Sequence, residues 1–283
     1  MSAAVRSRYV RVDDIRTHYL EAGSGHPVVL LHSGEYGACG ELSWEYTIDA
    51  LAQHFHVIAP DWLGFGGTDK IYDFETGSGR RFRHMARFLE TIDVPAAFFV
   101  GSSMGGSVLS RIAATDDPVL PIQAMVLSAG GGFVPANEAR AATVDYECTP
   151  EAMRRLVEVF FHDPKWAADE EYIRRRYESS IRPGQWEATA AARFRSPLTP
   201  PRQAIGQPDR TPYENIRVPT LVIAGADDKL REPGYADEIA ARIPDSRLRV
   251  YDDCGHLPHI ENAAEFNADV IEFLLECQKR LDG

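Results

Sequence analysis

The sequence predicts an α/β protein in which a mainly parallel sheet is covered by helices on both faces. Two observations predict it: short, continuous apolar segments rich in β-branched residues recur along the chain, and segments with helical spacing separate them. A chain of 283 residues, 44% of them hydrophobic, is long enough to bury a large core without a disulfide or a metal.

The expected strands have four to seven residues each, and they span residues 9–12, 15–21, 27–32, 55–60, 96–101, 124–128, 220–225 and 248–253. The expected helices alternate with them along most of the chain, at residues 46–53, 82–92, 108–114, 153–161, 235–243 and 263–278. Asn262 stands where a cap of the last helix is expected.

The alternation of strands and helices is interrupted once, between about Phe133 and Pro212, by a charged stretch rich in helix formers. We therefore expect a core in two parts, residues 1–132 and 213–283, with a helical cap at residues 133–212 between them. Open α/β sheets bind ligands at the carboxyl ends of their strands, so the cap is expected to lie over that edge.

Charge, apolar runs and cysteine spacing limit the classes of function that this chain is expected to have. The formal net charge of -12 and the absence of a basic block argue against a nucleic-acid partner. No apolar run is long enough for a membrane helix and the first residues lack a secretory signal, so a cytoplasmic location is expected. Four scattered cysteines without a CxxC pair are interpreted as free thiols rather than a metal site: Cys39, Cys148, Cys254 and Cys277.

The strongest motif is Gly101-Ser102-Ser103-Met104-Gly105-Gly106, which follows an expected strand and precedes an expected helix. The pattern G-x-S-x-G in this context predicts a nucleophile on a sharp turn, where flanking side chains would clash with the neighbouring strand and helix. The register of the motif selects Ser103, rather than Ser102, as the nucleophile.

A serine needs a base, and the base needs an acid that fixes its tautomer. His256 follows the strand at 248–253, and Asp228 follows the strand at 220–225, so both are expected at the same edge as Ser103. Asp227 is the rival acid and His259 the rival base.

An oxyanion hole needs two backbone N–H groups. One is expected from Met104, and the other from Gly34 in the loop after the strand at 27–32. The turn at residues 61–69 is interpreted as structural.

The motifs together resemble the α/β-hydrolase superfamily, and within it the meta-cleavage-product hydrolases. The resemblance extends over the whole chain, and its segments are LLHSGEYGA, VGSSMGGS, the cap stretch from MRRLVEVFF to SSIRPG, and CGHLPHIENAAEFNADVIEFL. It implies hydrolysis of a carbon–carbon bond in a vinylogous 1,5-diketone from aromatic-ring degradation, without metal or organic cofactor. It also implies an anionic small-molecule substrate and a homodimer.

The same resemblance implies that Arg176 binds the anionic dienoate end of the substrate, which suits a planar guanidinium. The chain departs from the family pattern at Ser33, Tyr36, Ser102 and Leu257, of which Ser33, Ser102 and Leu257 are expected to shape the substrate pocket. Phe160 or Phe161 is a candidate for an apolar wall.

Two other functions stay open. A carboxylesterase or lactonase uses the same triad and the same oxyanion hole, because both reactions pass an oxyanion at a carbonyl carbon. A non-catalytic ligand receptor on this fold is the alternative outside enzymes, and such proteins often lack a triad member or have a filled pocket. Reaction of Ser103 with a fluorophosphonate would separate enzyme from receptor.

Overall fold

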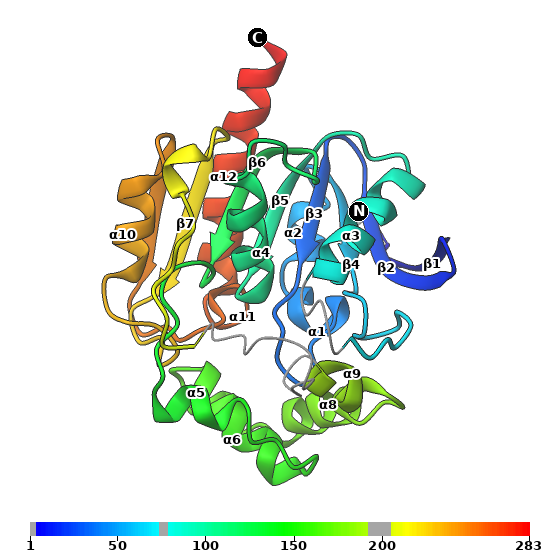
Figure 1. The fold of residues 1–283 in the computed structure, drawn as a ribbon, viewed down its shortest axis with the longest axis vertical. Helices are drawn as coiled ribbons and strands as arrows, with labels where there is room; N and C mark the ends of the chain where they lie inside the picture. The colour runs from blue at the N-terminus through cyan, green and yellow to red at the C-terminus, as the bar shows by residue number, and fades with distance from the viewer. Residues whose placement is uncertain (1–3, 74–78, 192–204) are drawn as a thin grey trace.

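The computed structural model describes residues 4–73, 79–191 and 205–283. Its centre is a sheet with the strand order β1-β2-β4-β3-β5-β6-β7-β8 (Figure 1). Strands β2 and β4 pair antiparallel, as do β1 and β2, and all the other pairs are parallel. The strands are β1 (Arg6–Val12), β2 (Ile15–Gly23), β3 (Pro27–Leu31), β4 (His56–Pro60), β5 (Ala97–Ser102), β6 (Ile122–Ser128), β7 (Thr220–Gly225) and β8 (Ser246–Tyr251). The predicted fold class is confirmed.

Helices cover both faces of this sheet. One apolar cluster joins it to α3 (Gly79–Thr91), α4 (Met104–Ala113) and α10 (Tyr235–Arg242). A second cluster on the other face joins it to α2 (Ile48–Leu51) and α12 (Ala263–Asp282). The short helices α1 (Gly40–Trp44), α11 (Pro258–Glu261) and η1 (Tyr213–Asn215) lie in connections.

Strand β3 shows why the apolar runs are continuous. Val28 and Leu30 belong to the cluster on one face, whereas Val29 and Leu31 belong to the cluster on the other. Successive side chains of a strand point to opposite faces, so a sheet covered on both sides buries every residue of such a strand.

The elements differ from the predictions mainly at their ends. The expected helix at 46–53 is only α2, and α4 begins at Met104, four residues before its expected start. Helix α12 continues to Asp282, and Asn262 stands at its N-cap position but its side chain makes no capping hydrogen bond. In the described part of the chain, no helix combines the length and apolar character needed to cross a membrane.

Five further helices form a separate layer beyond the carboxyl ends of the parallel strands (Figure 1). They are α5 (Glu138–Ala142), α6 (Pro150–Phe160), α7 (Lys165–Ala168), α8 (Glu170–Ser180) and α9 (Gln185–Ala191). A third apolar cluster ties α6 and α8 to Leu230, Leu257 and Ile260 of the core. These helices fall within residues 133–212, where the cap is expected, but residues 192–204 of that range lie outside the described residues, and the limits of the cap stay a prediction.

Candidate active site

Ser103 sits on a tight turn between β5 and α4. Its backbone has φ 49° and ψ -104°, a conformation that side chains rarely adopt. The flanking glycines make the turn sterically feasible: a Cβ on Gly101 would lie 2.5 Å from the Gly105 carbonyl carbon, and a Cβ on Gly105 would lie 2.2 Å from the Leu31 carbonyl oxygen. The turn presents the hydroxyl of Ser103 at the edge of the sheet.

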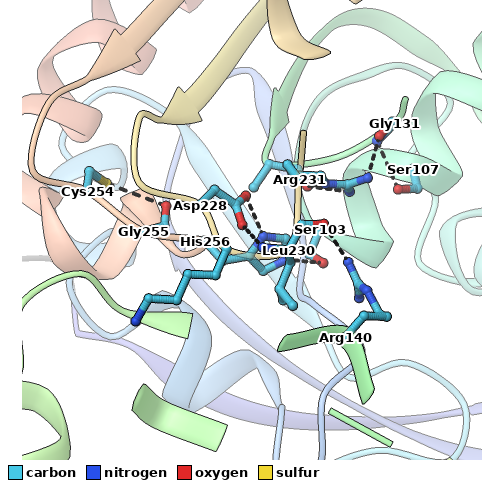
Figure 2. A network of polar contacts seen from close by, with 12 residues as sticks. Ser103, Ser107, Gly131, Arg140, Asp228, Leu230, Arg231, Cys254, Gly255 and His256 are labelled. Carbon is cyan, nitrogen blue, oxygen red and sulfur yellow. Dashed lines mark hydrogen bonds and ion pairs between the residues drawn. The ribbon is translucent and has the colours of Figure 1, made fainter. Parts of the chain in front are cut away.

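Ser103, His256 and Asp228 form a continuous hydrogen-bonded chain (Figure 2). Ser103 Oγ lies 2.8 Å from His256 Nε2, and His256 Nδ1 lies 2.7 Å from Asp228 Oδ2. The imidazole and the carboxylate are almost fully buried, whereas Ser103 is partly exposed. This geometry gives the hydroxyl a base, and the base an acid that orients it.

The Asp228 carboxylate is held in its ionised form. Burial alone would raise its pKa, but His256, Arg231 and the Leu230 backbone N–H lower the pKa of Asp228 below its usual value. The Leu230 N–H donates to Asp228 Oδ1 over 2.9 Å, which leaves Oδ2 for the imidazole. A fixed negative charge at this position favours the protonated imidazole that forms during proton transfer.

The rival residues lie elsewhere. Asp227 is exposed, and its carboxylate lies 3.2 Å from His162 Nδ1. His259 is fully buried, and its ring packs in a tilted orientation against the Trp44 ring, with 4.6 Å between the ring centroids. Burial lowers the pKa of His259 to about 3, so its imidazole is neutral at physiological pH. The structure therefore brings Asp228 and His256, not Asp227 and His259, to the nucleophile.

The two expected oxyanion-hole residues lie against each other beside Ser103. A Cβ on Gly34 would come within 2.8 Å of Met104 Sδ, and both residues line the same cavity as Ser103. Met104 is the first residue of α4, where a backbone N–H points out of the helix end rather than toward a carbonyl in the same helix. Their placement fits the two predicted donors.

A cavity of about 260 Å³ opens over the nucleophile, between the sheet edge and the cap. Phe160 forms part of its wall and also holds the base: its carbonyl oxygen accepts a 2.7 Å hydrogen bond from the His256 backbone N–H. The lining residues are Gly34, Glu35, Phe82, Ser103, Met104, Ser107, Val108, Arg111, Val134, Arg140, Thr143, Phe160, Arg231 and His256. Phe161 packs instead on Trp166 and Tyr172.

Arg176 does not line this cavity. It is buried behind it, where its guanidinium pairs with the Glu35 carboxylate and donates to the Tyr172 hydroxyl over 3.1 Å. The side chains of Arg176 and Glu35 are only 1% and 5% exposed, so their charges compensate each other away from water. Burial would raise the pKa of Glu35, but Arg176, Ser33 and the Glu35 backbone N–H together lower the pKa below its usual value, and the carboxylate is ionised. The role of Arg176 in substrate binding stays a prediction.

The three other residues expected in the pocket are fully buried. Ser102 ends β5, Ser33 follows β3, and Leu257 packs into the cluster between core and cap. None of them is among the residues that line the cavity, and their effect on substrate choice stays a prediction.

Four charged residues of the cavity were missed by sequence reasoning: Glu35, Arg111, Arg140 and Arg231. Arg231 donates to the carbonyl oxygens of Ala129 and Gly131 beside the triad acid. Its position three residues after Asp228 was the one available signal. Arg140 comes from the cap, Arg111 from α4 and Glu35 from a loop, and their sequence context carries no comparable signal.

One group of described residues has the ligand types of a metal site, namely His162, Asp227 and Asp253. All three are exposed, and none of them is among the residues that line the cavity. His162 and Asp227 already form an ion-pair contact of 3.2 Å. The hydrogen bonds that join Ser103, His256 and Asp228 involve none of these three residues.

Comparison with known proteins identifies the fold family of the chain and its similarity to hydrolases of ring-fission products. A family model described as the alpha/beta hydrolase fold matches residues 27–263. The 2-hydroxy-6-oxo-6-(2'-aminophenyl)hexa-2,4-dienoic acid hydrolase of Metapseudomonas resinovorans is 33% identical, over 96% of this chain and 92% of the relative. A 2-hydroxymuconate semialdehyde hydrolase of Pseudomonas sp. (strain CF600) is 31% identical, over 93% of this chain and 91% of the relative. The meta-cleavage product hydrolase structure from Pseudomonas fluorescens IP01 has a TM-score of 0.84 at 28% identity, and the match covers 95% and 97% of the two chains.

Proposed function

The chain belongs to the α/β-hydrolase fold family, and from that premise we propose that it hydrolyses a carbon–carbon bond in a vinylogous 1,5-diketone. The observation that carries the proposal is the hydrogen-bonded chain from Ser103 through His256 to Asp228, opening into a capped cavity. The relatives of 31–33% identity, which are named as hydrolases of ring-fission products, direct the choice of substrate.

In the proposed reaction, the dienol substrate first ketonises, which moves a proton from its 2-hydroxyl to the carbon next to the distal carbonyl. Ser103, or a water molecule in its place, then attacks that carbonyl while His256 Nε2 takes the proton of the attacking group. The negative charge on the carbonyl oxygen is stabilised by the backbone N–H groups of Gly34 and Met104.

Collapse of the oxyanion breaks the bond between the carbonyl carbon and the neighbouring carbon. The electron pair leaves as a dienolate, which is protonated, and His256 can return the proton it holds. An acyl-Ser103 intermediate, if formed, is released by water with His256 again as the base. The net change is the addition of one water molecule to give a carboxylic acid and a 2-hydroxydienoate.

A second candidate is hydrolysis of a neutral carboxylic ester or lactone. The specific observation that favours it is the Glu35–Arg176 pair, because the cation expected to hold a dienoate carboxylate is already neutralised by Glu35. A neutral ester needs only the triad, the oxyanion hole and the apolar wall at Phe160.

The deciding experiment compares kcat/KM for a yellow ring-fission dienoate and for simple aryl esters on the same preparation. We expect the dienoate to be the better substrate and Ser103→Ala to abolish turnover of both. Turnover of esters alone would select the second candidate. Failure of the wild-type protein to react with a fluorophosphonate would instead favour a ligand receptor.

The resemblance also supports proposals on organisation. We propose an anionic substrate, a cytoplasmic homodimer, and a cap with the limits 133–212. Size-exclusion chromatography with light scattering tests the dimer, and a structure with a bound carboxylate product tests the contacts of the cap.

A further inference from the structure

The charges around the cavity are unequally distributed. On the side of the oxyanion loop lies Glu35, whose charge is compensated by Arg176. On the side where the cap begins, the lining includes Arg140 and Arg111. Glu35 is the one acidic residue among the described residues that line this cavity, so the potential becomes positive toward Arg140 and Arg111.

Arg140 is fixed close to the triad. Its helix, α5, is capped by Asn137, whose side chain accepts from the Arg140 backbone N–H and donates to the Lys229 carbonyl. The Arg140 guanidinium donates to the Leu230 carbonyl over 3.0 Å, and the Leu230 N–H holds Asp228 (Figure 2). The cap arginine is therefore anchored on the same peptide segment that positions the triad acid.

Arg111 extends the positive region away from Ser103. It lies in the last turn of α4 and lines both the catalytic cavity and an adjoining cavity of about 480 Å³. Asp209 also lines the adjoining cavity, where its carboxylate accepts hydrogen bonds from the hydroxyls of Tyr213 and Thr211, at 2.6 and 2.7 Å. Arg111 helps to lower the pKa of Asp209, so this carboxylate offsets part of the Arg111 charge on the side away from Ser103. Val134 lines both cavities as well, so the two adjoin along Val134 and Arg111.

We propose that Arg140, assisted by Arg111, forms a subsite for a carboxylate carried on the acyl part of the substrate. This inference rests on the proposed function, in which the dienoate end of the substrate lies toward Arg176, so that the acyl substituent points to the opposite end. A guanidinium recognises a carboxylate through paired, charge-assisted hydrogen bonds. The substrate class is then a dianionic diketone, and the released acid is a dicarboxylic acid.

The test uses activated esters, because these need only the nucleophile and not carbon–carbon cleavage. Mono-4-nitrophenyl adipate and 4-nitrophenyl hexanoate have acyl chains of equal length and differ in the terminal carboxylate. We expect the adipate ester to have at least about tenfold the kcat/KM of the hexanoate ester, since a charge-assisted hydrogen bond contributes that much or more. In Arg140→Gln this ratio should fall to near one. Both esters are measured on the same variant, so any effect of the substitution on the triad through Leu230 cancels in the ratio.

Two further variants make the result decisive. Arg111→Gln leaves the Leu230 carbonyl with its partner and should lower the ratio partly, even if Arg140→Gln folds poorly. Arg155→Gln, on an exposed cap arginine paired with Glu147, should leave the ratio unchanged. Equal wild-type rates on both esters, or a ratio insensitive to Arg140 and Arg111, would overturn the subsite. A preference for 4-acetoxybenzoate, which carries its carboxylate on the leaving group, would overturn its acyl assignment.

The experiments distinguish a failure of the proposed subsite from a failure of the proposed function. A protein that prefers the adipate ester but leaves dienoate diketones intact has the subsite without the proposed reaction. A protein that cleaves neutral-acyl dienoates and ignores the adipate carboxylate has the reaction without the subsite.

Discussion

The Glu35 carboxylate pairs with the Arg176 guanidinium inside the protein, with both side chains at most 5% exposed. Removing one member of such a pair leaves an uncompensated buried charge, which typically costs about 3–5 kcal/mol. Glu35 lines the catalytic cavity and Arg176 does not, so Glu35 is the member of the pair that faces the substrate, while Arg176 is the cation that the resemblance assigns to the dienoate. Stability and substrate affinity are therefore expected to oppose each other here.

We expect Glu35→Gln to lower the melting temperature and to raise kcat/KM for a dienoate about tenfold relative to a neutral aryl ester. The uncompensated charge of Arg176 would then be available to the substrate carboxylate, in a charge-assisted interaction of about 1.5–3 kcal/mol. A carboxylate product should also raise the melting temperature of the variant more than that of the wild type. An equal change in kcat/KM for the dienoate and the ester would argue against a carboxylate at Arg176.

The acid of the triad is tested by a pair of adjacent substitutions. Asp228→Asn should reduce kcat by about 10⁴, because an amide at this position favours the wrong imidazole tautomer. Asp227→Asn is the matched control: its carboxylate contacts exposed His162, and turnover should stay near the wild-type value. Near-wild-type turnover in Asp228→Asn would mean that the His256–Asp228 hydrogen bond is not used in catalysis.

The sequence predicted the parts of the fold that have a local physical cause. Continuous apolar runs such as residues 27–31 follow from burial on both faces of the sheet, and the glycines around Ser103 follow from crowding in a tight turn. The Glu35–Arg176 pair has no such local cause. The two residues are 141 positions apart, and they meet only because α8 docks over the loop after β3. The same holds for Arg140, whose position depends on how α5 packs against Leu230.

The turn after β4 should govern part of the acid stability. Asp61 accepts hydrogen bonds from the backbone N–H groups of Gly40 and Gly67, at 2.6 and 2.7 Å, and pairs with His18 Nδ1 at 2.7 Å. Burial alone would raise its pKa, but His18, His32 and Gly40 lower the pKa of Asp61 below 3.8. A depressed folded-state pKa contributes stability that is present above the unfolded value and lost as pH falls through the folded value.

The free energy of unfolding should therefore decline as pH falls below about 4, and Asp61→Asn should remove part of that decline. At pH 7 the same variant should lose about 2 kcal/mol or more, because it weakens charge-assisted hydrogen bonds in the interior. Urea unfolding of both proteins at several pH values measures the two effects. A variant with wild-type pH dependence would show that other carboxylates dominate acid unfolding.

Two glycine substitutions separate crowding by backbone from crowding by a flexible side chain. A Cβ on Gly105 meets the Leu31 carbonyl oxygen at 2.2 Å, and neither strand β3 nor helix α4 can move without disturbing the core. A Cβ on Gly34 meets Met104 Sδ at 2.8 Å, and the end of a methionine side chain can rotate away. Gly105→Ala should thus destabilise the protein by about 3 kcal/mol or more, whereas Gly34→Ala should cost less than half as much. Thermal unfolding of the two variants checks this order, and equal losses would show that the turn at Ser103 has more freedom than its geometry indicates.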